Sequence, residues 1–226
     1  FPYTTLFRSS VQSDEYNYVP EGFFFTLQEL LCIAAEERRL KLRLSSQALY
    51  FKPEALEHAF NKGYDHTFGN DTLHISATKL LADGSLGART AYMRQPYADD
   101  PSTRGLLMFS QEELDKMVAI SHRNNTPAII HAIGDGAIQM CLDAIERAQK
   151  AMPYLKPRHG IVHCQVTDKA MIRRFKELDV VAYIQPVFID YDMNIIYDRV
   201  GRDLAESSYA WKEYKELGIH HPFGTD

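Results

Sequence analysis

The sequence has little that suggests a secreted, membrane or nucleic-acid-binding protein. Its 226 residues include three cysteines (Cys32, Cys141 and Cys164), too few for a disulfide framework, so reduced thiols and a cytoplasmic location are expected. No apolar run reaches the roughly 18 residues of a transmembrane span, and no signal peptide stands at the first residue given. The net charge of −5 argues against nucleic acid as a partner, because phosphate binding needs a basic face.

The sequence instead alternates short apolar, β-branched segments with amphipathic helical patterns. The predicted strands are residues 40–44, 73–81, 128–131, 161–163, 180–184 and 219–223. Helix starts are marked by capping boxes at Thr26–Glu29 and Ser110–Glu113 and by Pro53, and a last helix is expected near 203–217. Strands separated by helices imply parallel βαβ units with right-handed crossovers.

Long loops follow strands, at 83–105 and 186–202, and do not precede them. This is typical of a TIM (β/α)8 barrel, whose strand-to-helix loops build the site. Six strands do not close such a barrel. The predicted fold is therefore an α/β fold, namely a partial barrel of parallel strands, and the chain is expected to be a fragment. Residues 1–10 fit no element and are expected to be a non-native or disordered tail, which leaves residues 11–226 as the incomplete barrel. A doubly wound nucleotide-binding sheet would need a glycine fingerprint after its first strand, and the sequence has none.

Polar residues lie in or directly after five predicted strands: Lys79, His131, His163, Gln185 and Asp226. A single histidine at a strand end is more often a hydrogen-bonded structural residue than a ligand, but repetition on successive strands weakens that interpretation. Imidazoles and a carboxylate suit a divalent metal such as zinc. Such a metal lowers the pKa of bound water to roughly 7, and a nearby aspartate can move the proton.

Six segments, in order, resemble the amidohydrolase superfamily, and more closely its amidohydrolase-3 branch, which includes N-substituted formamide deformylases. The segments are residues 79–90, 131–135, 163–165, 185–186, 198–201 and 223–226. The resemblance implies that Lys79 is a strand-four lysine, which can be carboxylated and bridge metals. It implies that His131 and His163 are metal ligands, and that Asp226 contacts metal and is the general acid/base.

The same resemblance implies a substrate site around these ligands. Asp83, Ser85 and Arg89 match the glycine-rich loop beside the lysine and are expected to shape the substrate mouth. Gln165 and Gln185 stand where contacts to substrate, or to the metal ligands, are expected. Four aromatic residues near the predicted strand 180–184 either pack or line an apolar pocket, and the sequence leaves both interpretations open: Tyr183, Phe188, Tyr191 and Tyr197.

The chain also departs from the family pattern. The family's first strand carries a His-x-His pair, which this sequence lacks, and the adjacent His220 and His221 would point to opposite faces of a strand. The flanking β-sandwich of the family is also missing. Residues 160–163 read Gly-Ile-Val-His, where the family usually has Arg-Ile-Glu-His.

The resemblance therefore implies a metal-dependent hydrolase acting on a C–N bond, amide or N-formyl, through metal-bound hydroxide. Its cofactor would be Zn²⁺ or another divalent metal, as one or two ions. Its partner would be a small-molecule amide substrate, with no nucleic acid and no membrane, and self-association into a homo-oligomer is left open. The isolated fragment is expected to be inactive. The alternative is a truncated product or pseudoenzyme that at most binds metal weakly.

Overall fold

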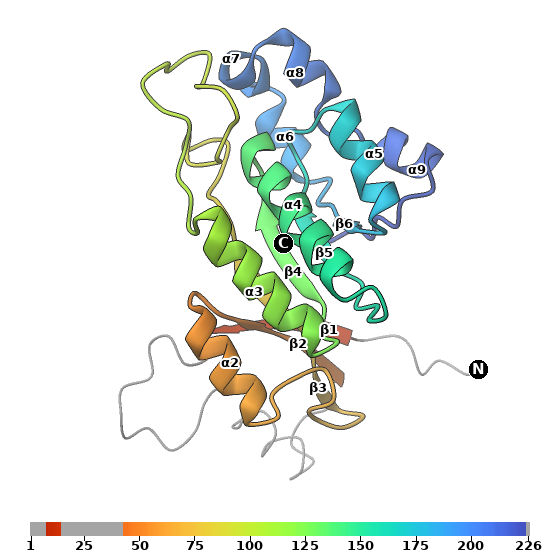
Figure 1. Ribbon diagram of the computed structural model, residues 1–226. Helices are drawn as coiled ribbons and strands as arrows, with labels where there is room; N and C mark the ends of the chain where they lie inside the picture. Colours follow the sequence, from red (N-terminus) through yellow and green to blue (C-terminus); the bar gives the residue numbers. More distant parts are fainter. Residues whose placement is uncertain (1–7, 15–42, 225–226) are drawn as a thin grey trace, which may run out of the picture.

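The computed structural model describes residues 8–14 and 43–224, which form one parallel sheet flanked by helices (Figure 1). Its strands are β1 (Arg8–Asp14), β2 (Arg43–Leu49), β3 (Leu73–Leu81), β4 (Ala128–Ala132), β5 (Gly160–His163) and β6 (Val181–Tyr183). Each strand pairs in parallel with the next one along the chain, in the order β1-β2-β3-β4-β5-β6. A doubly wound sheet would reverse its strand order part-way. The unbroken order is that of a barrel wall, so the predicted partial barrel is confirmed.

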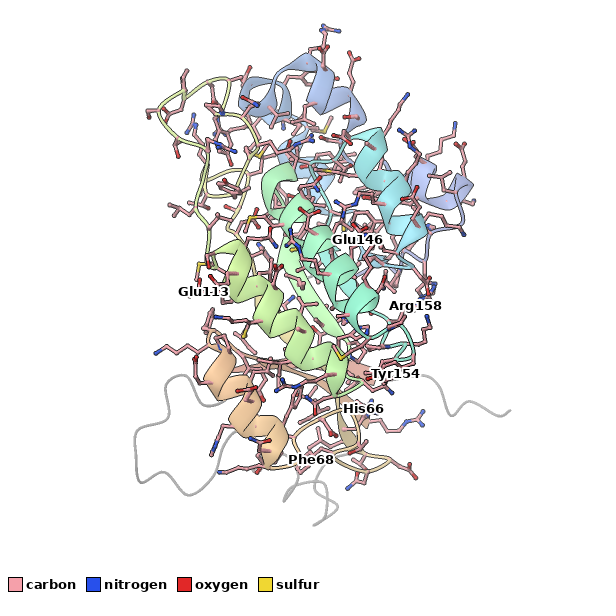
Figure 2. The ribbon with its side chains drawn as sticks, in the orientation of Figure 1. His66, Phe68, Glu113, Glu146, Tyr154 and Arg158 are labelled. Carbon is pink, nitrogen blue, oxygen red and sulfur yellow. The ribbon has the colours of Figure 1, made fainter. Side chains whose placement is uncertain are left out.

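Helices follow strands β2 to β6, and the first two begin where the sequence signals indicate. They are α2 (Pro53–Asn61), α3 (Gln111–Arg123), α4 (Asp135–Ala151), α5 (Lys169–Glu177), α6 (Phe188–Asp192), α7 (Ile196–Val200), α8 (Arg202–Ser207) and α9 (Trp211–Glu216). Helix α2 has proline in its first turn, and Ser110 and Glu113 form a complete capping box at the start of α3. Glu113, labelled in Figure 2, lies at that start. No helix among the described residues is both long and apolar enough to cross a bilayer.

The main core lies between the sheet and helices α3, α4 and α5. It includes Leu80, Ile130 and Ile161 from the strands, which pack with Val118 and Leu142 from the helices. A separate, smaller cluster occupies the other face of the strands: Ala77, Ile129 and Val162, with Tyr183 packed against them. In a barrel wall the second face is the inner one. Side chains alternate between the two faces along a strand, so the inner face of β4 continues from Ile129 to residue 131.

The amino-terminal part differs from the prediction in its strands. Strand β1 begins at Arg8, so Arg8–Ser10 pair in the sheet, and a non-native or disordered tail over residues 1–10 stays a prediction. The sequence of β1 is rich in serine and has no periodic pattern of apolar residues. Its parallel pairing with β2 is made by backbone groups, which requires no such side-chain pattern. The strand predicted at 40–44 overlaps β2 only at 43–44, since β2 continues to Leu49. The capping box at Thr26–Glu29 and Cys32 lie outside the described residues.

The carboxyl-terminal part also differs from the prediction. The helix expected near 203–217 is two helices, α8 and α9, because Tyr209 between them has a left-handed backbone (φ 52°). The predicted loop 186–202 contains the short helices α6 and α7. The strand predicted at 219–223 is reduced to a single parallel bridge between Ile184 and Phe223.

Candidate metal centre

The segments that follow β3 and β6 gather at one end of the molecule. The long loop after β3 and helices α6, α7 and α8 after β6 lie at the top of Figure 1, and α2 lies at the bottom. Strands β4 and β5 bring the two predicted histidine ligands to the carboxyl edge of the sheet, where His163 is the last residue of β5. In α/β barrels this edge carries the reacting groups.

The rings of His131 and His163 meet at this edge. Their centroids are 4.5 Å apart and the ring planes are nearly perpendicular, at 74°. Nε2 of His131 lies 3.0 Å from the carbonyl oxygen of Gly84. Because a carbonyl oxygen only accepts, Nε2 must carry the proton and donate it, which leaves Nδ1 as the ring atom with a free lone pair. A metal-binding histidine is commonly oriented by such a hydrogen bond from its other nitrogen.

An unusual backbone accounts for the meeting of the two rings. His131 pairs with Val162, and Ala132 pairs with His163, so simple alternation along the strands would place the two histidines on opposite faces of the sheet. His163 and Cys164 instead have left-handed backbones, with φ of 78° and 51°. Such conformations cost roughly 1–3 kcal/mol each in residues other than glycine and concentrate at functional sites. We attribute the turn of the His163 ring toward His131 to these two residues.

The imidazole of His163 is held neutral. It is 4% exposed, and burial, followed by the nearby His131 and Lys79, lowers its pKa to about 3, while Gln185 acts weakly in the opposite direction. The ring also contacts Phe188 of α6, with centroids 5.5 Å apart. A neutral imidazole is the form that binds a metal ion.

Lys79 lies on the adjacent strand, β3, and is 6% exposed. In the register of β3 and β4, Lys79 pairs with Ile129 and Leu81 pairs with His131, so Lys79 and His131 project from the same face of neighbouring strands. The charge of Lys79 contributes to the lowered pKa of His163. Carboxylation of Lys79 stays a prediction.

The described residues supply part of a metal-binding set. Among residues 8–14 and 43–224, no three histidine, cysteine, aspartate or glutamate side chains are arranged so that they could hold a metal ion. The two imidazoles and Lys79 fit a divalent ion in their chemistry, and a zinc site needs at least three protein ligands. Asp226 lies outside the described residues; the chain is described up to Gly224, whose amide donates to the carbonyl of Ile184 just after β6 (3.0 Å).

Asp83 is placed differently from the other residues predicted to bind substrate. Its carboxylate is fully buried and accepts hydrogen bonds from the backbone amides of Tyr92, Ile133 and Gly134, at 2.8–3.0 Å. It also lies 3.4 Å from Nε2 of His131. In this structure Asp83 therefore positions the loop and the β4–α4 turn. Direct contact with substrate stays a prediction.

The remaining predicted substrate residues divide into exposed and buried ones. Ser85 is exposed, and Arg89 binds both oxygens of Asp99, with each contact at 3.0 Å. Gln165 and Gln185 are buried after β5 and β6, and the Oε1 atom of each has no hydrogen-bond partner within the described part of the chain. Of the four residues, Gln185 affects the pKa of His163 through its side chain.

Residues 26–226 match the model of the amidohydrolase family. The chain belongs to this family. It is 35% identical over 155 residues to "Putative amidohydrolase YtcJ" of Bacillus subtilis (strain 168), which covers 68% of this chain and 28% of that protein. Among solved structures, metal-dependent hydrolases from Pyrococcus furiosus and Pyrococcus horikoshii OT3 are 32% and 33% identical, with TM-scores of 0.75 and 0.74. Each alignment covers 87% of this chain, and 39% and 38% of the solved chains.

These comparisons confirm the amidohydrolase superfamily and its amidohydrolase-3 branch. The chain spans well under half the length of the relatives it matches, so the activity of a whole amidohydrolase is not shown by this similarity. One group of charged residues beside the centre was not predicted from the sequence, namely Arg94 with Asp135 and Asp168. The available signal was spacing, because the two aspartates follow His131 and His163 by four and five residues.

Proposed function

We propose that the protein is a metal-dependent amidohydrolase that hydrolyses a C–N bond in a small-molecule amide or N-formyl substrate. The observation that carries the proposal is the pair His131 and His163, which meet at the carboxyl edge of adjacent strands with the latter ring neutral. Two converging imidazoles suit zinc or another divalent ion, as one or two ions. When bound, such an ion supplies a hydrolytic nucleophile from water at neutral pH.

The other roles rest on family membership and the position of each residue. Lys79, buried on the same face as His131, would complete the ligand set after carboxylation of its amine. Asp226 would take a proton from the attacking water and return it to the departing nitrogen, so that no net proton is gained or lost. Gln185, near His163, and Gln165 would orient the substrate, with Ser85 and Arg89 at the mouth. The proposal includes action in the cytoplasm and no nucleic-acid or membrane partner.

A second candidate is a non-catalytic barrel that binds metal weakly. It is favoured by one observation, namely that no three histidine, cysteine, aspartate or glutamate side chains within residues 8–14 and 43–224 form a group that could hold a metal ion. The two candidates differ in their expected metal content and in turnover, so one experiment separates them.

The test is the zinc content of the purified protein after zinc-replete expression, measured by elemental analysis. Near-stoichiometric zinc is expected in the unmodified protein and in His58→Ala, which removes an exposed histidine on α2. Loss of zinc is expected in the double variant His131→Ala/His163→Ala. Amine release from a panel of N-formyl compounds and simple amides should follow the zinc content.

The outcomes separate the parts of the proposal. No zinc in the unmodified protein would contradict the metal centre. Zinc without amine release from any substrate would support the non-catalytic barrel. Equal zinc in the double variant and in His58→Ala would show that the ligands lie elsewhere.

A further inference from the structure

Arg94 lies in the loop between β3 and α3 and contacts the turns that follow both histidine-bearing strands. Its Nε donates to Asp135 at 2.7 Å, and its Nη2 donates to Asp168 at 2.6 Å. The backbone amide of Arg94 also donates to Asp135, at 2.9 Å. One planar guanidinium therefore joins the β4–α4 turn to the β5–α5 turn.

Both carboxylates are fixed parts of helix starts. Asp135 is the first residue of α4, and its side chain is 3% exposed. Asp168 is the N-cap of α5, and its Oδ1 accepts from the amide of Met171 at 2.8 Å. A carboxylate at a helix start is favoured by the helix dipole and the unpaired amides there. Moving either carboxylate would therefore move the start of its helix.

The loop that carries Arg94 is packed tightly on the β4–α4 turn. The amide of Ala137 donates to the carbonyl oxygen of Tyr92 at 3.1 Å. A Cβ atom added to Gly134 would lie 2.1 Å from the same oxygen, so only glycine permits this approach. The loop and the β4–α4 turn thus form one packed unit, and the second arm of Arg94 extends from that unit to α5.

We propose that Arg94 is a positioning residue that sets the separation of His131 and His163. The argument rests on the proposed function, since the separation matters when both rings bind one ion. Asp135 and Asp168 follow the two histidines by four and five residues in the sequence. The guanidinium of Arg94 therefore holds the two turns at a fixed spacing close to each ring. Lysine would not replace it, because an ammonium group lacks the planar, two-sided geometry of guanidinium.

The sharpest test uses Asp168→Asn, which removes the charged partner of Arg94 on α5. Asparagine is as good an N-cap as aspartate, so the start of α5 is retained. The matched control is Arg174→Gln. Arg174 also joins the same two helices, from α5 to Asp143 and Glu146 of α4 at 2.8 Å each, but along the helices and not at their starts. Glu146, labelled in Figure 2, lies in the body of α4.

Three quantities are measured for each protein: the thermal midpoint, the zinc Kd, and the NMR resonances of the His131 and His163 imidazoles in the metal-free state. Asp168→Asn is expected to shift both imidazole resonances and to weaken zinc binding by on the order of 10-fold. Its thermal midpoint should fall no more than that of Arg174→Gln. Arg94→Lys should behave like Asp168→Asn.

The resonances decide on Arg94 independently of the proposed function. If Arg174→Gln shifts the imidazole resonances as much as Asp168→Asn does, or if Asp168→Asn shifts neither, the positioning role is wrong. If the unmodified protein binds no zinc while Asp168→Asn still shifts both resonances, the positioning of the rings stands and the metal-dependent function fails.

Discussion

Two pairs of histidine rings lie at opposite ends of β4 and β5, and they differ in almost every property except residue type. At the carboxyl ends, His131 and His163 meet edge to face at 4.5 Å. At the amino ends, His122 and His159 stack with centroids 5.2 Å apart and planes at 24°. His159 directly precedes the first residue of β5. The two pairs therefore serve as internal comparisons within one sheet.

The hydrogen bonds of the amino-end pair assign every ring nitrogen. The amide of Ala128 donates to Nδ1 of His159 at 2.9 Å, so Nε2 of His159 carries the proton. That Nε2 donates to Nδ1 of His122 at 2.9 Å. Nε2 of His122 then donates to the carbonyl of Met152 at 3.1 Å. Every ring nitrogen of the two residues is engaged in a hydrogen bond, which is a structural arrangement with no ring atom left for a metal.

The carboxyl-end pair is held in the opposite way. His131 donates from Nε2 to the carbonyl of Gly84, which leaves the lone pair on its Nδ1 for a ligand, and His163 has a left-handed backbone. Backbone strain and an available hydrogen-bond acceptor, as at the carboxyl end, are typical of a functional site. Complete hydrogen bonding of every ring nitrogen, as at the amino end, is typical of structural residues. The hydrogen bonds of the ring nitrogens therefore distinguish the two pairs, whereas the presence of two histidines does not.

The largest expected effect comes from breaking the saturated pair. His159→Ala removes the acceptor of the Ala128 amide and the donor to His122, and it leaves two buried polar groups unsatisfied. Each such group costs about 1–3 kcal/mol, so the free energy of unfolding should fall by about 3 kcal/mol. Urea unfolding measures the change, and the exposed His58→Ala is the control. A loss below 1 kcal/mol, on the order of a surface substitution, would show that water replaces the ring.

A change in pH should act on the same pair with a graded effect, smaller than this within any one pH unit. Burial, followed by the nearby His122, lowers the pKa of His159 to about 3, whereas an unfolded histidine has a pKa of about 6.5. Between these pH values the unfolded state binds a proton at His159 that the folded state does not bind. The contribution of His159 to the free energy of unfolding is therefore fully present above about pH 6.5. It is lost as the pH falls toward 3, by up to about 1.4 kcal/mol per pH unit.

The contribution of this proton is obtained by comparing how the free energy of unfolding depends on pH in the unmodified protein and in a variant that lacks the titrating ring. Urea unfolding between pH 4 and 7 is compared for the unmodified protein and His159→Gln, which does not titrate. Carboxylates contribute equally to both, so the unmodified protein should lose stability more steeply with acid. Parallel pH profiles would mean that His159 is protonated in the folded state and that the hydrogen-bond assignment above is wrong.

Local signals in the sequence predicted most of the sheet and the histidine pair of the site. Strands β3 to β6 are rich in apolar and β-branched residues, and the start of α3 is a capping box, so each is encoded within a few residues. His131 and His163 were identified because the same strand–turn–helix pattern repeats. The strand β1 lacks an apolar pattern, and the break at Tyr209 depends on a left-handed backbone at a residue that does not favour it.

The features missed at the site depend on contacts between distant residues. Arg94 is 41 residues from Asp135 and 74 from Asp168 in the sequence, and no local pattern connects them. Asp83 was predicted at the substrate mouth because it lies in a glycine-rich loop. Its burial follows from three amides, two of which belong to the β4–α4 turn some 50 residues away. The identity of a site residue was thus predictable from its own segment, and its hydrogen-bond partners were not.

The smallest expected effect is also the most specific to the strained pair. Asparagine adopts left-handed backbones more readily than most residues, so His163→Asn should relieve strain that offsets the lost ring contacts. The free energy of unfolding should change by less than about 1 kcal/mol. The matched variant is His131→Asn, at a residue without positive φ, which loses the hydrogen bond to Gly84 and should cost about 1 kcal/mol. Zinc binding should be lost in both. If His163→Asn is the more destabilising of the two, the left-handed backbone does not store strain, and the contrast between the two histidine pairs reduces to their hydrogen bonds alone.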